Sequence, residues 1–200
     1  MRISKDPEER KQEIIKAAMV LFEERGIQKT SMSDIAKKLD VAKGLIYYYF
    51  RSKDELIAFV IESFSTVVDE EIRKIMKNDA LDFYGKLGAI LNLFFSSIRE
   101  HPTLMNITPG NPGMFEYIKT RLSEIAITHA SALIEEGKRE GFIENKYPGY
   151  MLKILISGIA DLYMEGITDP NIHRTLIEEA LGIPEGKIVL KAYYSSEEAP

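Results

Sequence analysis

The sequence predicts an all-α protein with a small N-terminal domain and a larger helical domain, about nine helices in total. Three observations predict this class. Apolar residues recur at helical spacing through most of the chain, Ser-x-x-Asp and Ser-x-x-Glu patterns mark helix starts, and Gly or Pro marks the breaks. A chain of 200 residues with 45% hydrophobic residues can bury the cores of both domains.

Three helices are expected near the N-terminus. Residues 8–25 place apolar side chains at helical spacing and are followed by a glycine. Ser31 and Asp34 form a capping-box pattern that opens a second, short helix. A connection of three residues, 40–42, leads to a third helix at 43–50. Two short helices joined by so tight a turn are typical of a helix-turn-helix, whose second helix enters the major groove of DNA.

The third helix has two different faces. Ile46 and Phe50 are four residues apart and are expected to pack inward. The other face carries Lys43, Gly44, Tyr47 and Tyr48. A glycine lowers helix stability by about 1 kcal/mol relative to alanine, so Gly44 suggests the close approach of a large group such as a DNA backbone. Taken without their surroundings, the tyrosines favour a buried core.

The chain from residue 51 onward is expected to form the larger domain. Ser52 and Glu55 form a second capping pattern that opens a long helix at 53–77. Further helices are expected at 80–99, 114–140, 147–167 and 171–181. The segment 101–113 is rich in proline and glycine and is not one regular element. The stretch KIVLKAYY in the tail fits either a short helix or an extended segment.

The charge of the chain is unevenly distributed. Residues 1–53 hold twelve Lys and Arg against eight Asp and Glu, a net charge of +4, whereas residues 54–200 have a net charge of −9. This asymmetry suggests that the N-terminal domain meets a polyanion, although a charge of +4 also arises by chance. The absence of cysteine excludes disulfides and fits a reducing compartment. We expect a cytoplasmic protein without a membrane partner, because neither a signal peptide nor an apolar run of ~18 residues is present.

One stretch carries a recognisable motif string. Its matching positions are Gly26, Thr30, Ser31, Ile35, Ala36, Val41, Lys43, Gly44, Tyr47, Phe50, Ser52, Lys53 and Leu56. In this register the run GIQKTSMSDIAKKLDVAKGLIYYYFRSKDEL resembles the DNA-binding domain of the tetracycline-repressor (TetR) family of bacterial transcription regulators. Outside this stretch only the helical architecture is similar.

The resemblance implies a helix-turn-helix DNA-binding domain at 1–50 and a ligand-binding and dimerisation domain at 51–200. It also implies which residues contact DNA. Thr30, Ser31 and Ser33 match phosphate contacts at the start of the second helix. The positions of the recognition helix are Lys43, Gly44, Leu45, Tyr47 and Tyr48. Lys53 matches a lysine that clamps a phosphate.

Three positions depart from the family pattern. Asp40 stands where the family usually has glycine, and Ala42 replaces the usual Ser or Thr cap, whose loss costs about 1 kcal/mol. Leu45 replaces a common threonine, which favours partly apolar base contact with a thymine methyl group. The negative charge of Asp40 counts against phosphate contacts by the turn.

A mostly apolar ligand pocket is expected between the middle helices. These helices carry more Met and aromatic residues than a slim helical bundle needs to fill its own core. Each of these residues taken singly is explained equally well by an ordinary core or by a dimer interface. The candidate lining residues are Phe83, Leu87, Leu91, Phe94, Met105, Met114, Phe115, Ile118, Leu122, Met151 and Leu155. The effector is expected to be a small apolar or amphipathic molecule.

The last two helices are expected to form the interface of a homodimer. Their apolar and small residues are Leu155, Gly158, Ile159, Leu162, Ile172, Leu176 and Ile177. Two copies of these helices would form a four-helix seam. The two-fold symmetry then requires a palindromic operator.

No pattern in the sequence indicates catalysis, a metal or a cofactor. The three histidines are far apart in the sequence, and no phosphate loop or nucleophile motif is present. The favoured hypothesis is a ligand-responsive, DNA-binding transcriptional regulator, a repressor released from its operator by a small molecule. The alternative is a helical binding or carrier protein whose DNA-binding head is weakened by Asp40 and Ala42. An enzyme acting on an apolar substrate has no residue in its favour.

Overall fold

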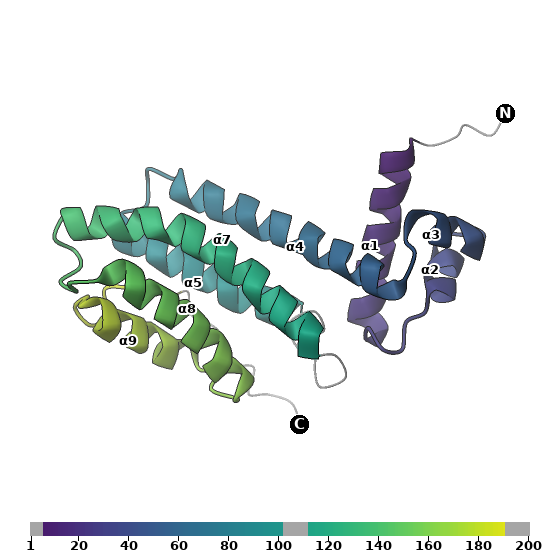
Figure 1. The fold of residues 1–200 in the computed structure, drawn as a ribbon. Helices are drawn as coiled ribbons and strands as arrows, with labels where there is room; N and C mark the ends of the chain where they lie inside the picture. Colours follow the sequence, from purple (N-terminus) through teal and green to yellow (C-terminus); the bar gives the residue numbers. More distant parts are fainter. Residues whose placement is uncertain (1–5, 102–111, 191–200) are drawn as a thin grey trace, which may run out of the picture. The chain divides into compact units, whose positions relative to one another are not determined.

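The computed structural model describes residues 6–101 and 112–190, and these contain eight α-helices and no strand (Figure 1). The helices are α1 Pro7–Arg25, α2 Met32–Lys38, α3 Lys43–Tyr49, α4 Lys53–Met76, α5 Phe83–Glu100, α7 Pro112–Arg139, α8 Pro148–Met164 and α9 Pro170–Leu181. The predicted all-α class is confirmed, and each helix expected from periodicity is present within a few residues of its predicted bounds. None of these helices has the length and apolarity needed to cross a lipid bilayer.

The structure describes the tail that follows α9 as far as residue 190. Residues 183–190 form neither helix nor strand, and Ile183 and Ile188 are buried. The carboxylate of Glu178 accepts hydrogen bonds from the backbone N–H groups of Gly186, at 3.0 Å, and Ile188, at 2.8 Å. The irregular segment is therefore fixed to α9 by a buried side chain. The remainder of KIVLKAYY lies outside the described residues.

The chain divides into two compact units. The N-terminal unit comprises 1–68 with 98–120, and the C-terminal unit comprises 69–97 with 121–200, as far as these ranges are described. Helix α4 gives its first part to one unit and its last turns to the other. The functional boundary expected after residue 50 stays a prediction.

The N-terminal unit is built around side chains that α1, α2 and α3 bury together. Ile14 and Phe22 of α1, Ile35 of α2 and Ile46 of α3 are fully buried, as is Phe50 directly after α3. Phe50 also meets Phe59 of α4 edge to face, with ring centroids 5.5 Å apart. The two inward positions predicted for the third helix are thus confirmed as core.

The turn between α2 and α3 explains the acid at position 40. Asp40 has φ 52°, the one positive φ among the described residues other than glycine. Its N–H donates to the carbonyl of Lys37, and the N–H of Val41 donates to the carbonyl of Ala36. This pair of bonds is a Schellman motif, which needs a left-handed residue that Gly, Asn or Asp adopts most easily. Asp40 therefore meets the same backbone requirement as the glycine it replaces.

The C-terminal unit packs α5, α7, α8 and α9 around one core. Its buried residues include Leu87, Leu133, Ile134, Leu152 and Leu181. Figure 1 shows these helices in blue to yellow-green, with α8 and α9 antiparallel and joined by a short connection. Several of the core side chains also surround a cavity.

Candidate nucleic-acid interface and ligand pocket

Helix α2 begins with the predicted capping box. The Ser31 hydroxyl accepts from the N–H of Asp34 at 3.2 Å, and the Asp34 carboxylate accepts from the N–H of Ser31 at 2.9 Å. The hydrogen bond from the Ser31 hydroxyl and that from its backbone hold the pKa of Asp34 below its usual value. Ser31 is exposed and Ser33 is partly exposed. Both hydroxyl-bearing residues are therefore accessible near the start of α2.

Thr30 does not fit its predicted role as a phosphate contact. Its side chain is only 1% exposed. Its hydroxyl lies 2.9 Å from the carbonyl oxygen of Gly26 and 3.2 Å from that of Leu21, at the end of α1. Thr30 instead satisfies carbonyl groups left free at the end of a helix. The motif match located the position correctly but not the direction of the side chain.

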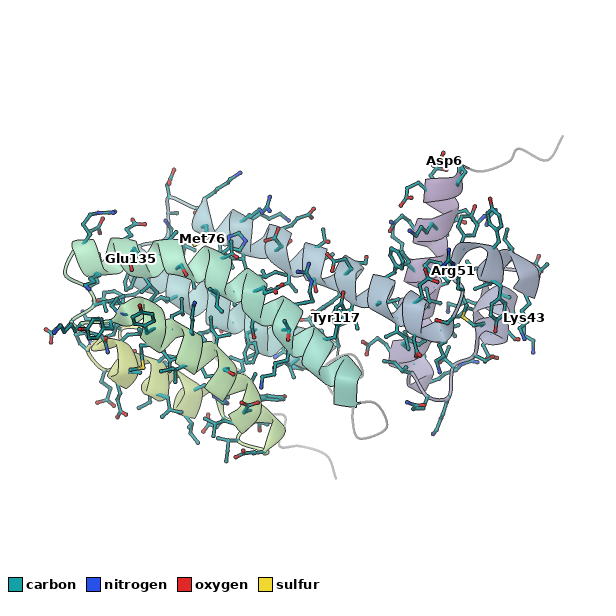
Figure 2. The ribbon with its side chains drawn as sticks, viewed as in Figure 1. Asp6, Lys43, Arg51, Met76, Tyr117 and Glu135 are labelled. Atoms are coloured by element: carbon teal, nitrogen blue, oxygen red, sulfur yellow. The ribbon has the colours of Figure 1, made fainter. Side chains whose placement is uncertain are left out.

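Helix α3 presents the predicted outward face. Tyr48 is 80% exposed, Tyr47 is 45% exposed, and Gly44 is exposed as well. Lys43, labelled in Figure 2, is exposed on the same helix. The Lys43 ammonium lies 5.6 Å from the Tyr47 ring centroid, within range of a cation–π contact. Ala42 caps α3 without a side-chain hydrogen bond, as expected. A short helix anchored by buried apolar groups thus shows a cation and two phenols to the outside.

The start of α4 lies against the loop that precedes α2. The Lys53 ammonium donates to the carbonyl of Gln28 at 3.5 Å, and partial burial lowers the pKa of this lysine. The Ser52 hydroxyl accepts from the N–H of Glu55 at 3.1 Å, so the second predicted cap forms. Lys53 remains partly exposed, as does Leu45 on α3. Of the nine predicted DNA contacts, eight therefore reach the surface and Thr30 does not.

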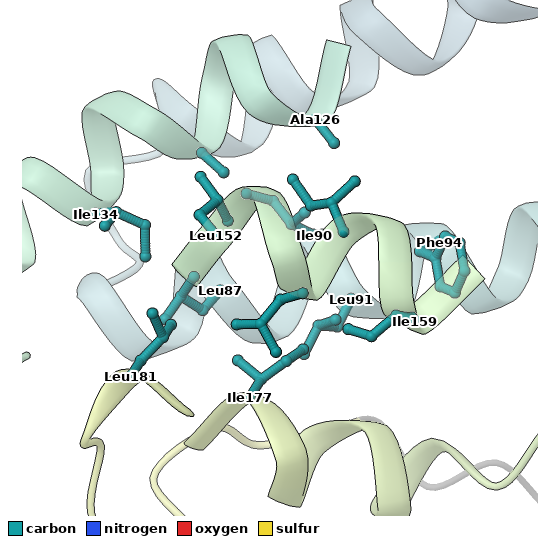
Figure 3. Close-up of a pocket in the computed structure, with 13 residues that line it drawn as sticks. Leu87, Ile90, Leu91, Phe94, Ala126, Ile134, Leu152, Ile159, Ile177 and Leu181 are labelled. Atoms are coloured by element: carbon teal, nitrogen blue, oxygen red, sulfur yellow. The ribbon is translucent and has the colours of Figure 1, made fainter. Parts of the chain in front are cut away.

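A cavity of about 120 Å³ lies inside the C-terminal unit, between α5, α7, α8 and α9 (Figure 3). Its walls are aliphatic apart from one phenylalanine ring. The lining residues are Leu87, Ile90, Leu91, Phe94, Ala126, Ala130, Ile134, Leu152, Leu155, Ile156, Ile159, Ile177 and Leu181. Such walls offer no hydrogen-bonding side chain to a ligand.

Four of the residues predicted to line a ligand pocket lie at this cavity. Leu87, Leu91, Phe94 and Leu155 line the cavity. Phe83, Leu122 and Met151 do not line this cavity: Phe83 packs in the core against Phe142, and Leu122 and Met151 are partly buried. Met105 lies outside the described residues, as do the side chains of Met114, Phe115 and Ile118.

Three predicted interface residues also belong to the cavity. Ile159 and Ile177 are buried and line it, which corrects their assignment to a dimer surface. Leu155, which was predicted for both sites, is partly buried and lines the cavity as well. Gly158 and Leu162 are partly exposed, and Ile172 and Leu176 are exposed. The most exposed large apolar side chains of α8 are Tyr150, at 72%, and Ile154, at 65%. Neither was predicted as an interface residue. Their spacing of four residues was the available signal.

No cluster of three or more metal-ligating side chains occurs in the described part of the chain. His173 is buried, with its Nε2 2.6 Å from the carbonyl oxygen of Ile167. Burial raises the pKa of Tyr163, whose ring contacts that of Phe94.

The geometry agrees with comparisons to known proteins. The family described as bacterial regulatory proteins, tetR family, matches residues 14–60, which cover the later part of α1, all of α2 and α3 and the start of α4. The uncharacterized HTH-type transcriptional regulator YvdT of Bacillus subtilis is 28% identical over 167 residues, covering 83% of this chain and 76% of YvdT. The similarity therefore continues beyond the N-terminal unit.

A second relative and a solved structure are also similar to this chain. The HTH-type transcriptional regulator TtgR of Pseudomonas putida is 30% identical over 97 residues, 48% of this chain, and the match spans only 46% of TtgR. The crystal structure of RolR in complex with resorcinol shares the fold, with a TM-score of 0.69 at 16% identity over 92% of this chain and 96% of RolR. About half of the chain thus resembles a known regulator, and its helical architecture recurs in a solved structure.

Proposed function

Because this chain belongs to the tetR family of bacterial regulatory proteins, we propose that it is a repressor that binds a palindromic operator as a homodimer. The family consists of helix-turn-helix transcriptional regulators, which are not enzymes. We further propose that a small apolar molecule, bound in the C-terminal unit, releases the protein from DNA.

The observation that carries the DNA-binding role is the outward face of α3. Tyr47, Tyr48 and Lys43 are exposed on a helix whose Ile46 is fully buried. A cation and hydroxyl groups on a major-groove helix suit phosphate oxygens and base edges. Asp40 was one of the two residues that favoured the alternative of a carrier protein with a weakened DNA-binding head. Its left-handed backbone conformation in the turn explains why an aspartate can stand there.

Replacement of Lys53 by Ala tests the proposed phosphate contact. We expect weaker binding to every DNA sequence and a fall of about 1 in the slope of log K against log salt concentration, since one phosphate contact is lost. Fluorescence anisotropy with a selected operator and a scrambled duplex measures both effects.

Lys153 on α8 is a matched control, because it is an exposed lysine of the other unit. Lys153→Ala should leave the salt slope unchanged. Equal slopes for Lys53→Ala and the unmodified protein would show that Lys53 does not contact DNA.

The cavity supports an apolar effector. The walls carry no charged or hydrogen-bonding side chain, and unpaired polar ligand groups are costly to bury there. Dry apolar cavities of about 150 Å³ bind benzene, and the resorcinol bound by RolR is likewise a single ring. A ligand of this kind affects DNA binding only if it prefers one arrangement of the helices.

Benzene is therefore expected to bind in this cavity and raise the melting temperature of the protein, whereas benzoate at the same concentration should not. The carboxylate of benzoate would lose its hydration without gaining a partner. Differential scanning calorimetry measures the shift, and Ala130→Leu, which fills the cavity, should abolish it. A shift with benzoate alone would contradict an apolar site.

The dimer proposal is supported by the surface of α8 and α9. Tyr150 and Ile154 on α8 and Ile172 and Leu176 on α9 expose apolar side chains on two helices that contact each other. Apolar surface of this kind is typical of homodimer interfaces. A two-fold dimer presents two recognition helices, which requires an operator with inverted half-sites.

A further inference from the structure

A hydrogen bond joins α4 to α7 inside the C-terminal unit. The Asp69 carboxylate on α4 lies 2.6 Å from Nε2 of His129 on α7. A carboxylate only accepts, so the histidine nitrogen donates. This contact is the main cause that lowers the pKa of Asp69. Two helices separated by 60 positions in the sequence are thus tied by one side-chain pair.

His129 stands on a turn of α7 that also forms the wall of the cavity. Ala126 and Ala130 line the cavity, three positions before and one after the histidine. Successive helical residues point about 100° apart, so α7 shows one face to the cavity and the adjacent one to α4. Any displacement of α7 by a ligand therefore acts on the bond to Asp69.

Asp69 also stands on the helix that continues into the N-terminal unit. Helix α4 runs without interruption from Lys53 to Met76, and Asp69 is the first residue that it contributes to the C-terminal unit. A bond at this point restrains the part of α4 that is closest in sequence to the N-terminal unit.

The bond can break without leaving a buried charge unpaired. Arg73, one turn further along α4, lies 2.8 Å from the second carboxylate oxygen of Asp69. The Asp69 side chain is 24% exposed and that of His129 is 16% exposed, so water reaches both. Losing one partner therefore costs far less than it would for an isolated buried ion. The hydrogen bond between α4 and α7 can therefore form and break reversibly.

We propose that the Asp69–His129 hydrogen bond couples the cavity to the DNA-binding helices, with His129 as a positioning residue that acts on α4 through Asp69. The inference rests on the proposed function, since it assumes that the protein binds an operator and an apolar effector. Beyond the proposed function, it names the contact through which effector binding changes the affinity for the operator. Coupling between two such sites changes affinity by about 5- to 150-fold.

The test is a double-mutant cycle on the response to benzene, in the full-length chain. Operator dissociation constants are measured with and without saturating benzene for the unmodified protein, His129→Leu, Asp69→Ala and the double variant. Benzene should raise the constant at least fivefold in the unmodified protein. Each single variant and the double variant should respond less than twofold, because all three lack the same bond.

Two controls separate coupling from a general structural role. His129→Gln retains a side-chain N–H donor of similar reach and should restore at least half of the response. Lys74→Ala breaks an ion pair with Glu71 that lies within α4 alone, at 2.6 Å, and should respond as the unmodified protein does. Calorimetry on each variant shows whether benzene still binds.

The outcomes are distinct. A normal response in His129→Leu, additive losses in the cycle, or bound benzene without any response in the unmodified protein would each overturn the coupling role. Failure of the unmodified protein to bind any operator, or to bind benzene, would overturn the proposed function and this inference with it.

Discussion

Replacing Phe50 by Ala is expected to destabilise the N-terminal unit by about 3–5 kcal/mol, the usual range for a buried phenylalanine. Phe50 is fully buried, directly after the recognition helix, and its ring meets that of Phe59. Without it α3 loses an anchor to α4. Urea unfolding followed by circular dichroism measures the decrease in the free energy of unfolding. Amide NMR signals of residues 43–49 show whether α3 is the helix that becomes less ordered.

Tyr48→Ala is the matched comparison, two positions earlier. The tyrosine is 80% exposed, so its truncation should change the free energy of unfolding by less than about 0.5 kcal/mol while weakening operator binding. If Tyr48→Ala destabilised the fold as much as Phe50→Ala, the division of α3 into an anchoring and a contacting face would be wrong.

Gly44→Ala is expected to stabilise the free protein and to weaken its operator complex about tenfold or more. An added Cβ would meet no atom within 4 Å, and alanine favours helix over glycine by about 1 kcal/mol. On DNA the same methyl group would stand where the backbone approaches the helix, and each 1.4 kcal/mol of steric cost lowers affinity tenfold. Thermal unfolding and anisotropy titration measure the two opposite changes.

Gly149→Ala on α8 controls for the effect of helix propensity. Its added Cβ would meet nothing nearer than 3.9 Å, and it lies outside the N-terminal unit. This variant should gain stability without losing DNA affinity. If Gly44→Ala bound the operator as tightly as the unmodified protein, close approach of DNA at α3 would be excluded.

Much of the N-terminal unit follows from local sequence rules. Helical spacing and a serine cap at Ser31 located α1 to α3 closely, and Ile46 and Phe50 were identified as core from their spacing alone. The φ of Asp40 could not be read from the sequence, because an acid at that position is equally compatible with an extended turn. The direction of Thr30 was missed because a hydroxyl near a helix start suits two roles, a phosphate contact and a partner for carbonyl groups of the preceding helix.

The C-terminal unit was harder to predict at the level of side chains. Helix α8 is apolar on several faces, so its periodicity does not tell which residues face the cavity and which face outward. Ile159 was therefore assigned to the surface, whereas Ile154 was not recognised as exposed. The Asp69–His129 bond depends on the packing of α4 against α7, which no local pattern encodes.

Selection of bound sequences from a random DNA pool tests whether α3 reads DNA within a two-fold dimer. The full-length protein is expected to enrich an inverted repeat. Its binding should weaken steeply as salt rises and weaken further when Tyr48 is replaced by Ala. Failure to enrich any sequence, or enrichment that Tyr48→Ala leaves unchanged, would contradict the assignment of α3 as the helix that reads DNA.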